Sequence, residues 1–195
     1  MSKTAHAASA LDVDRVRAHC LLLLLLALPL PSAAGEPTGP SAAAALFDRL
    51  PPSWRDDRGE TLRLSALRGQ RIFVTMAYTS CHRICPMTMT RLEQLQRDLD
   101  ARGIGADFLV VSYDPGNDDS VAWRRYRTSH RLLRDNWHFL SGTPADTERL
   151  ARALGFEYWR DGEHVMHDFR IVALGGDGAQ RGVIDSVHRD WQDLL

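Results

Sequence analysis

Two cysteines four positions apart are the residues of this chain best suited to chemistry. Cys81 and Cys85 lie between an apolar, strand-like run at 72–78 and a helix-like stretch from 87 to about 101. Thiols at such a strand-to-helix turn can hold a soft metal ion or cycle between dithiol and disulfide. Pro86 follows directly and fits the first position of a helix, so we expect Cys85 at the helix cap and Cys81 in the preceding loop.

The spacing of the pair favours a chemical role over a structural disulfide. Both thiols would face the positive end of a helix dipole, which favours the thiolate that binds metals or attacks disulfides. A bridge from Cys81 to Cys85 would close a loop of about five residues and contribute only ~2 kcal/mol. Two sulfurs suit Cu(I), and an added imidazole also suits Cu(II) or Zn(II). The pattern therefore calls for a third ligand.

Strands and helices alternate along most of the chain. Residues 64–69 form a helical turn that ends at Gly69, and Gly175 to Gly178 form a hairpin turn. The apolar periodicity predicts strands at 71–78, 107–112, 137–140, 169–174 and 182–184, and helices at 87–101, 120–133, 144–154 and 185–195. This order predicts an α/β sheet with a parallel part and an antiparallel edge. Sites in such sheets gather at the carboxyl ends of strands, where the cysteine segment falls.

Composition narrows the class of protein. The chain has 195 residues, enough for one domain, and 44% of them are hydrophobic. A formal net charge of -1 gives no electrostatic support for a nucleic-acid partner.

The N-terminus has the layout of a targeting segment. Two arginines precede an apolar run at 20–30, and small residues at Ala34 and two positions before it suit cleavage after Ala34. The run is shorter than the ~20 residues of a spanning helix. We expect residues 1–34 to be a signal peptide. The alternative is an uncleaved N-terminal anchor, which would be the only membrane contact of the protein. Residues 35–45 would be a linker and residues 46–195 the folded domain.

Export changes the meaning of the cysteines. Cys20 precedes the apolar run rather than following it, which argues against a lipoprotein attachment site, and it would be lost with the leader. Only Cys81 and Cys85 then remain in an oxidising compartment. We expect the bacterial periplasm, or the outer face of the cytoplasmic membrane.

A set of short motifs spread over most of the chain resembles the copper chaperones of the SCO/SenC family. The resemblance runs from about Trp54 to Ile184. Its carriers are Asp57-x-Gly59, the 64–69 turn, Tyr78-Thr79-x-Cys81-x3-Cys85-Pro86, Ser112-x-Asp114-Pro115, Leu140-x-Gly142-x-Pro144 and a histidine before the final hairpin. It implies a thioredoxin-like fold, with a central mixed sheet, flanking helices and a C-terminal β-hairpin.

The resemblance also implies a ligand set and a role. Family members bind copper through the two cysteines and that histidine, and deliver it to the binuclear copper site of cytochrome c oxidase. Cys81 and Cys85 are then the sulfur ligands. His167 keeps the family spacing to the last hairpin and His164 does not, so His167 is the third ligand; His82 is at most auxiliary. The implied partners are an oxidase subunit or another copper acceptor protein, and a copper donor protein.

Several positions leave alternatives open. Asp114 could orient His167 or a loop amide, or simply form a turn before Pro115. Asp168 stands where the family usually has Ser or Thr, and His82-Arg83 where it often has Pro-Asp. These departures bear on metal preference, redox potential and partner choice more than on the fold.

The rival function is an enzyme. A thiol-disulfide reductase would use the same activated thiolate, with Cys81 and Cys85 redox-active, on the cysteines of a partner protein. A thiol peroxidase is disfavoured because its Pro-x3-Thr-x2-Cys spacing is absent. Met87, Met89 and Trp159 are expected to be packing residues. The alternatives are a role as thioether ligands for Met87 and Met89 and a partner contact for Trp159.

Overall fold

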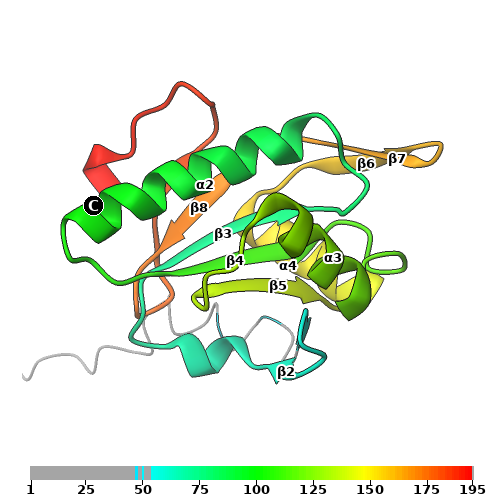
Figure 1. The fold of residues 1–195 in the computed structure, drawn as a ribbon, viewed down its shortest axis with the longest axis horizontal. Helices are drawn as coiled ribbons and strands as arrows, with labels where there is room; N and C mark the ends of the chain where they lie inside the picture. The colour runs from blue at the N-terminus through cyan, green and yellow to red at the C-terminus, as the bar shows by residue number, and fades with distance from the viewer. Residues whose placement is uncertain (1–46, 48–49, 51–53, 195) are drawn as a thin grey trace, which may run out of the picture. The chain divides into compact units, whose positions relative to one another are not determined.

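The computed structural model describes residues 47, 50 and 54–194 (Figure 1). The expected leader at 1–34, Cys20 and the linker at 35–45 lie outside the described residues. Within the described part, no helix has both the length and the apolar character that crossing a bilayer requires.

A seven-stranded mixed sheet forms the centre of the domain, in the order β2-β1-β5-β4-β3-β8-β9. Its three middle strands are parallel, and the pairs at both edges are antiparallel. The bounds are β1 Trp54–Asp56, β2 Thr61–Leu62, β3 Ile72–Ala77, β4 Asp107–Ser112, β5 Trp137–Ser141, β8 Ile171–Leu174 and β9 Gln180–Ile184. The predicted α/β architecture with an antiparallel edge is confirmed.

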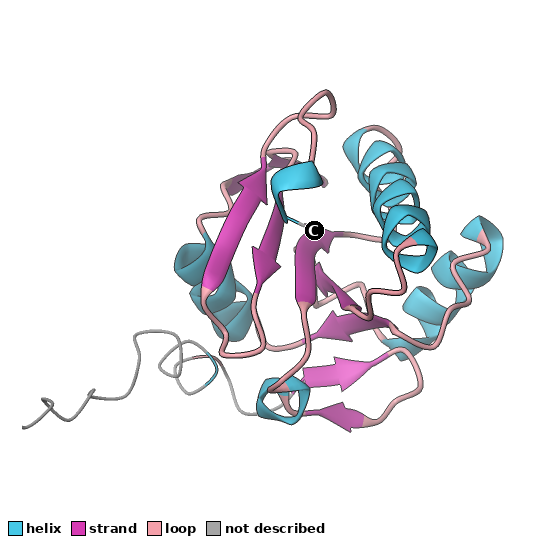
Figure 2. Cartoon of the chain, turned by 90° about the vertical axis from the view of Figure 1, so that its left-hand side faces the viewer, coloured by secondary structure: helices cyan, strands magenta, loops and turns pink. Residues whose placement is uncertain are grey.

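Helices cover both faces of this sheet (Figures 1 and 2). They are α2 (Ile84–Ala101), α3 (Ser120–His130) and α4 (Pro144–Leu154), with short 3₁₀ turns η2 (Leu64–Leu67) and η3 (Gln192–Leu194). The strands β3, β4 and β5 are parallel and lie next to one another in chain order, and α2 and α3 connect them. Right-handed crossovers therefore place both helices on the same face of the sheet. Because α2 follows β3 in the chain, it starts at the carboxyl end of that strand.

The middle strands are buried on both faces, as their continuous apolar side chains predict. Phe73, Phe108 and Trp137 stack across β3, β4 and β5, with ring centroids 5.5 and 5.1 Å apart. The predicted apolar face of α2 is buried against the sheet through Met89, Leu92, Leu95 and Leu99. This packing gives the site a rigid base at the ends of β3 and β4.

Two local expectations were wrong. Helix α2 begins at Ile84, so Cys85 lies in its first turn and is not the cap; Pro86 is tolerated there because the first amide groups of a helix have no intrahelical partner. The C-terminal helix expected at 185–195 is only the 3₁₀ turn η3 among the described residues.

The structure also contains a pair of strands that the sequence did not predict. Strands β6 (Tyr158–Asp161) and β7 (His164–His167) form a separate two-stranded hairpin. Only Val165 and His167 of its strand residues are buried, and its apolar side chains are interrupted by charged and polar ones, so it lacks a continuous hydrophobic signal. Asp161-Gly162 is a turn signal that could have revealed it, and Gly162 adopts a φ of 61°, which suits glycine.

Candidate metal centre

The cysteine loop joins the end of β3 to the first turn of α2. The Cys81 amide donates to the carbonyl of Tyr78, which closes a turn (3.1 Å). The Cys85 amide in turn donates to the Sγ of Cys81 (3.4 Å). The sulfur therefore takes the place of an N-cap acceptor at the positive end of the helix. The predicted link between the thiols and the helix dipole holds for Cys81, through a direct hydrogen bond.

The β6–β7 hairpin supplies the third side chain. Side chains alternate along β7: Val165 and His167 are buried, whereas His164 and Met166 are exposed. This period of two explains why His167 reaches the interior and His164 does not. Tyr158 on β6 is the cross-strand neighbour of His167.

Cys81, Cys85 and His167 converge on one point. The Nε2 of His167 lies 3.7 Å from the Sγ of Cys81 and 3.5 Å from the Sγ of Cys85, and the three atoms lie within 4.8 Å of one another. With metal–sulfur and metal–nitrogen bonds of about 2.3 and 2.0 Å, a tetrahedral or trigonal centre requires sulfur–nitrogen separations of about 3.5 to 3.7 Å. The imidazole nitrogen thus already has the separation from both sulfurs that a bound first-row metal would impose.

The imidazole of His167 has the tautomer that a metal ligand needs. Its Nδ1 lies 2.8 Å from the backbone carbonyl of Asp168, which can only accept, so Nδ1 carries the proton. The Nε2 lone pair then faces the two sulfurs. A backbone carbonyl in this role is a common way to fix the orientation of a ligating histidine.

The two thiols have opposite pKa shifts. A hydrogen bond from the Cys85 thiol lowers the pKa of Cys81, with further help from the backbone amides of Arg83 and Cys85, against the opposing effect of burial. That same hydrogen bond, together with burial, raises the pKa of Cys85. In the metal-free protein one proton is therefore retained on Cys85, and Cys81 is the thiolate.

Two tyrosine rings flank the His167 imidazole. Tyr78 meets it edge-on, with centroids 5.9 Å apart, and Tyr113 lies against it at 4.7 Å and 30°. Burial raises the pKa of both hydroxyls, so both rings are neutral phenols at physiological pH. Two neutral aromatic rings thus pack against the imidazole.

Asp118 is a buried carboxylate that the sequence did not single out as a site residue. The α3 cap is Asp119, whose side chain accepts from the Ala122 amide. Asp118 instead accepts from the amide and the hydroxyl of Thr79 (3.0 and 2.6 Å) and from the hydroxyl of Ser112 (2.5 Å). It therefore ties the cysteine loop to the end of β4. The spacing of residues along the chain does not reveal that Asp118 is hydrogen-bonded to the cysteine loop.

Asp114 lies in the turn after β4. Its carbonyl accepts from the amides of Asn117 and Asp118, as expected of a turn former. Its carboxylate accepts from the Asn117 amide group and from Arg160 on β6. The hydrogen-bond partner of the His167 imidazole is instead the Asp168 carbonyl. Any effect of Asp114 on His167 would therefore act through the hairpin.

A cavity of about 700 Å³ opens over the site. Cys81 and His167 line it, together with Tyr78, His82, Arg83, His164 and Met166, whereas Cys85 does not. The cysteine pair thus has an outer member, Cys81, and an inner member, Cys85.

Met87 and Trp159, expected to be packing residues, are 48% and 60% exposed, and Met166 is 42% exposed. Met89 is buried as expected.

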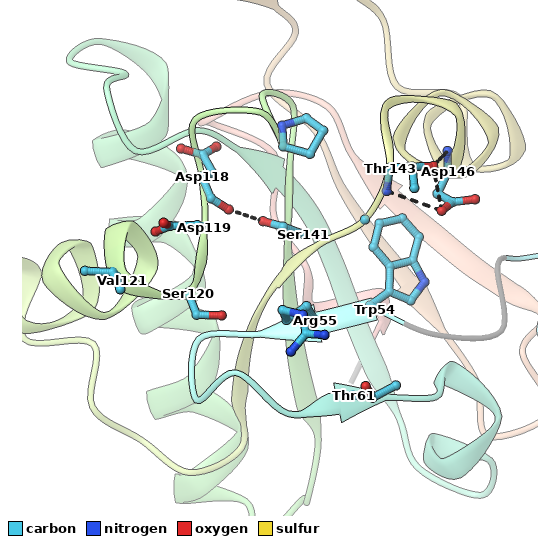
Figure 3. Close-up of a pocket in the computed structure, with 12 residues that line it drawn as sticks. Trp54, Arg55, Thr61, Asp118, Asp119, Ser120, Val121, Ser141, Thr143 and Asp146 are labelled. Atoms are coloured by element: carbon cyan, nitrogen blue, oxygen red, sulfur yellow. Dashed lines mark hydrogen bonds between the residues drawn. The ribbon is translucent and has the colours of Figure 1, made fainter.

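A second cavity, of about 540 Å³, lies where β1 and β5 meet the starts of α3 and α4 (Figure 3). Several of its polar groups have hydrogen-bond partners within the fold. Ser141 donates to the Asp118 carbonyl, and Thr143 and Asp146 form the capping box of α4. Neither cysteine nor His167 lines this cavity, so the chemistry of the chain belongs to the first.

A buried Cys-Cys-His group at the carboxyl end of a thioredoxin-like sheet is typical of thiol proteins that bind soft metals. Comparison with known proteins identifies the family: the sequence pattern of the SCO1/SenC family matches residues 52–193. The chain belongs to that family.

Individual relatives agree with this assignment. The SCO1 protein homolog of Bacillus subtilis is 29% identical over 136 residues, which cover 68% of this chain and 70% of the homolog. The structure of BsSco, described as a member of the Sco family of cytochrome c oxidase assembly proteins with a disulfide switch, has a TM-score of 0.62 and 25% identity, covering 70% of this chain and 82% of BsSco. Copper-bound ScoI of Bradyrhizobium japonicum has a TM-score of 0.60 and 20% identity, covering 71% and 89%.

Proposed function

We propose that this chain binds one copper ion through Cys81, Cys85 and His167 and carries it to a copper acceptor protein. The observation that supports this most directly is the approach of the His167 Nε2 to both sulfurs, at 3.7 and 3.5 Å. Two sulfurs and an imidazole form a donor set that suits copper. Membership of a family with a copper-bound member supports the choice of copper over zinc.

The arrangement of the ligands suits release as well as binding. Cys85 is fully buried, whereas Cys81 and His167 border the open cavity. An incoming donor atom from a partner would enter this cavity and replace Cys81 or His167 first, with Cys85 the last to let go. The proposed acceptor is the binuclear copper site of cytochrome c oxidase, and a copper donor protein would load the site through the same opening.

The thiol-disulfide reductase alternative is less well supported. It accounts for the thiolate at Cys81 and the protonated thiol at Cys85, but it gives the buried imidazole of His167 no function. We further propose that the protein is exported, because residues 1–34 have the layout of a signal peptide.

A copper titration of the reduced protein tests the proposal. Cu(I) would be added in competition with a chromophoric chelator, and we expect one ion per chain. Cys81→Ser, Cys85→Ser and His167→Ala should each weaken binding by more than the ~10–100-fold typical of outer-shell changes. His164→Ala is the matched control, because His164 is exposed on the same strand, and it should bind as the wild type does. Unchanged affinity in Cys85→Ser would overturn the proposal.

A further inference from the structure

His167 lies on an element that cannot hold it in place alone. The β6–β7 hairpin is a separate two-stranded sheet, and isolated hairpins of this kind are marginally stable. The imidazole must nevertheless keep its Nε2 within bonding range of two sulfurs that belong to the main sheet and α2. Contacts from the main sheet to His167 therefore decide how well the site is formed before a metal ion arrives.

Tyr113 makes the closer of the two aromatic contacts to His167. It follows β4 directly, and its amide donates to the carbonyl of Ala77 at the end of β3 (2.8 Å), which fixes its backbone to the centre of the sheet. Its side chain is buried, at 2% exposed. Its ring lies against the imidazole of His167 at 4.7 Å, and the Tyr158 ring packs on it at 5.0 Å.

The hydroxyl of Tyr113 makes a second contact beside the same histidine. It points to the carboxylate of Asp168, at 3.5 Å, the outer limit of a hydrogen bond. Asp168 is the residue whose carbonyl accepts from the Nδ1 of His167, and its own amide donates to Glu157. One phenol therefore touches the face of the imidazole and the residue that sets the imidazole's tautomer.

We infer that Tyr113, with Asp168, is a positioning residue that holds His167 ready for the metal in the metal-free protein. This inference rests on the proposed function and deepens it. The ring restricts rotation of the imidazole, and the contact between the hydroxyl and Asp168 keeps the carbonyl of that residue opposite Nδ1. A preformed ligand loses less conformational freedom on binding, so Tyr113 raises copper affinity without touching copper.

The first readout requires no copper. Imidazole nitrogen NMR of the reduced, metal-free protein reports the tautomer and order of His167, with its signal identified by its loss in His167→Gln. We expect a single Nδ1–H form in the wild type. Tyr113→Leu should give an averaged mixture of tautomers, and Tyr113→Phe, which keeps the ring, a partial loss of order.

The second readout is Cu(I) affinity. It should fall about 10–100-fold in Tyr113→Leu, the usual range for residues that support a ligand, and less in Tyr113→Phe. Tyr126→Leu and Tyr126→Phe are matched controls, because Tyr126 is equally buried, its hydroxyl has no partner in the described part of the chain, and its ring packs on Trp123, Phe139 and His130. Both should leave the His167 signal unchanged.

The outcomes separate the inference from the proposed function. A wild type that binds no copper would end the proposed function, while the NMR result would still decide the role of Tyr113. A folded Tyr113→Leu variant with wild-type His167 signal and affinity would overturn the inference. Should that variant not fold, Tyr113→Phe decides: a His167 signal as ordered as in Tyr126→Phe would overturn it too.

Discussion

The Nε2 of His167 lies 3.5 Å from the Sγ of Cys85, although 82 positions separate the two residues in the chain. One comes from the first turn of α2 and the other from the end of the β6–β7 hairpin. The hairpin has no strand in the main sheet, so its attachment at the ends of β3 and β4 brings the two atoms together. The distance between His167 and the sulfurs therefore depends on how firmly the hairpin is attached at the ends of β3 and β4.

The pKa shift of Cys81 predicts its reactivity. Because the Cys85 thiol and two backbone amides hold the pKa of Cys81 below its usual range, Cys81 stays a thiolate as the pH falls. Its alkylation by iodoacetamide in the metal-free reduced protein should slow by less than about threefold from pH 8 to pH 6. An ordinary thiol, with a pKa of about 8.5, would slow by about 75-fold.

Mass spectrometry would follow this reaction residue by residue. Cys85→Ala removes the main hydrogen-bond donor to the Cys81 sulfur, so the alkylation rate of that variant should fall steeply towards pH 6. An ordinary pH profile for Cys81 in the wild type would contradict the assignment of the thiolate to this cysteine.

Neighbouring aspartates should have different effects. Asp118→Ala leaves the donors of Thr79 and Ser112 without their acceptor, which should cost about 2 to 3 kcal/mol in the free energy of unfolding and also weaken copper binding. Asp119→Ala removes only the α3 cap and should cost about 1 kcal/mol without affecting copper. Urea denaturation and the copper competition measure both. Equal copper affinities in the two variants would show that Asp118 is not needed to hold the cysteine loop.

Asp114 should matter less than its position suggests. Its partner Arg160 is 55% exposed, and ion pairs with an exposed member contribute little. The opposing effects of burial and of the Asn117 and Arg160 hydrogen bonds leave the pKa of Asp114 lowered, so it is ionised at neutral pH. Asp114→Asn should cost less than about 1 kcal/mol and change copper affinity less than about threefold. A loss of copper binding comparable to that of His167→Ala would mean that Asp114 supports the imidazole directly.

The central sheet could be predicted from the sequence because its signals are local. The strand at 107–112 and the helix at 144–154 were predicted at their observed bounds, since continuous apolar side chains and a Pro start with a Gly end define them. The convergence of Cys81, Cys85 and His167 was expected only from the family resemblance, because nothing local to the three residues shows that they meet.

What could not be predicted depends on tertiary contacts. The hairpin strand 164–167 is held by attachment to the sheet rather than by a hydrophobic pattern of its own. Asp118 and Tyr113 gain their importance from partners on other elements, Thr79 on the cysteine loop and His167 on the hairpin. Spacing along the chain carries no record of such contacts.

X-ray absorption spectroscopy of the protein loaded with one equivalent of Cu(I) tests the central claim most directly. The account predicts a first shell of two sulfurs near 2.3 Å and one nitrogen near 2.0 Å, with the nitrogen lost in His167→Ala and one sulfur lost in Cys85→Ser. A wild-type shell that contains no nitrogen, or fewer than two sulfurs, would contradict it.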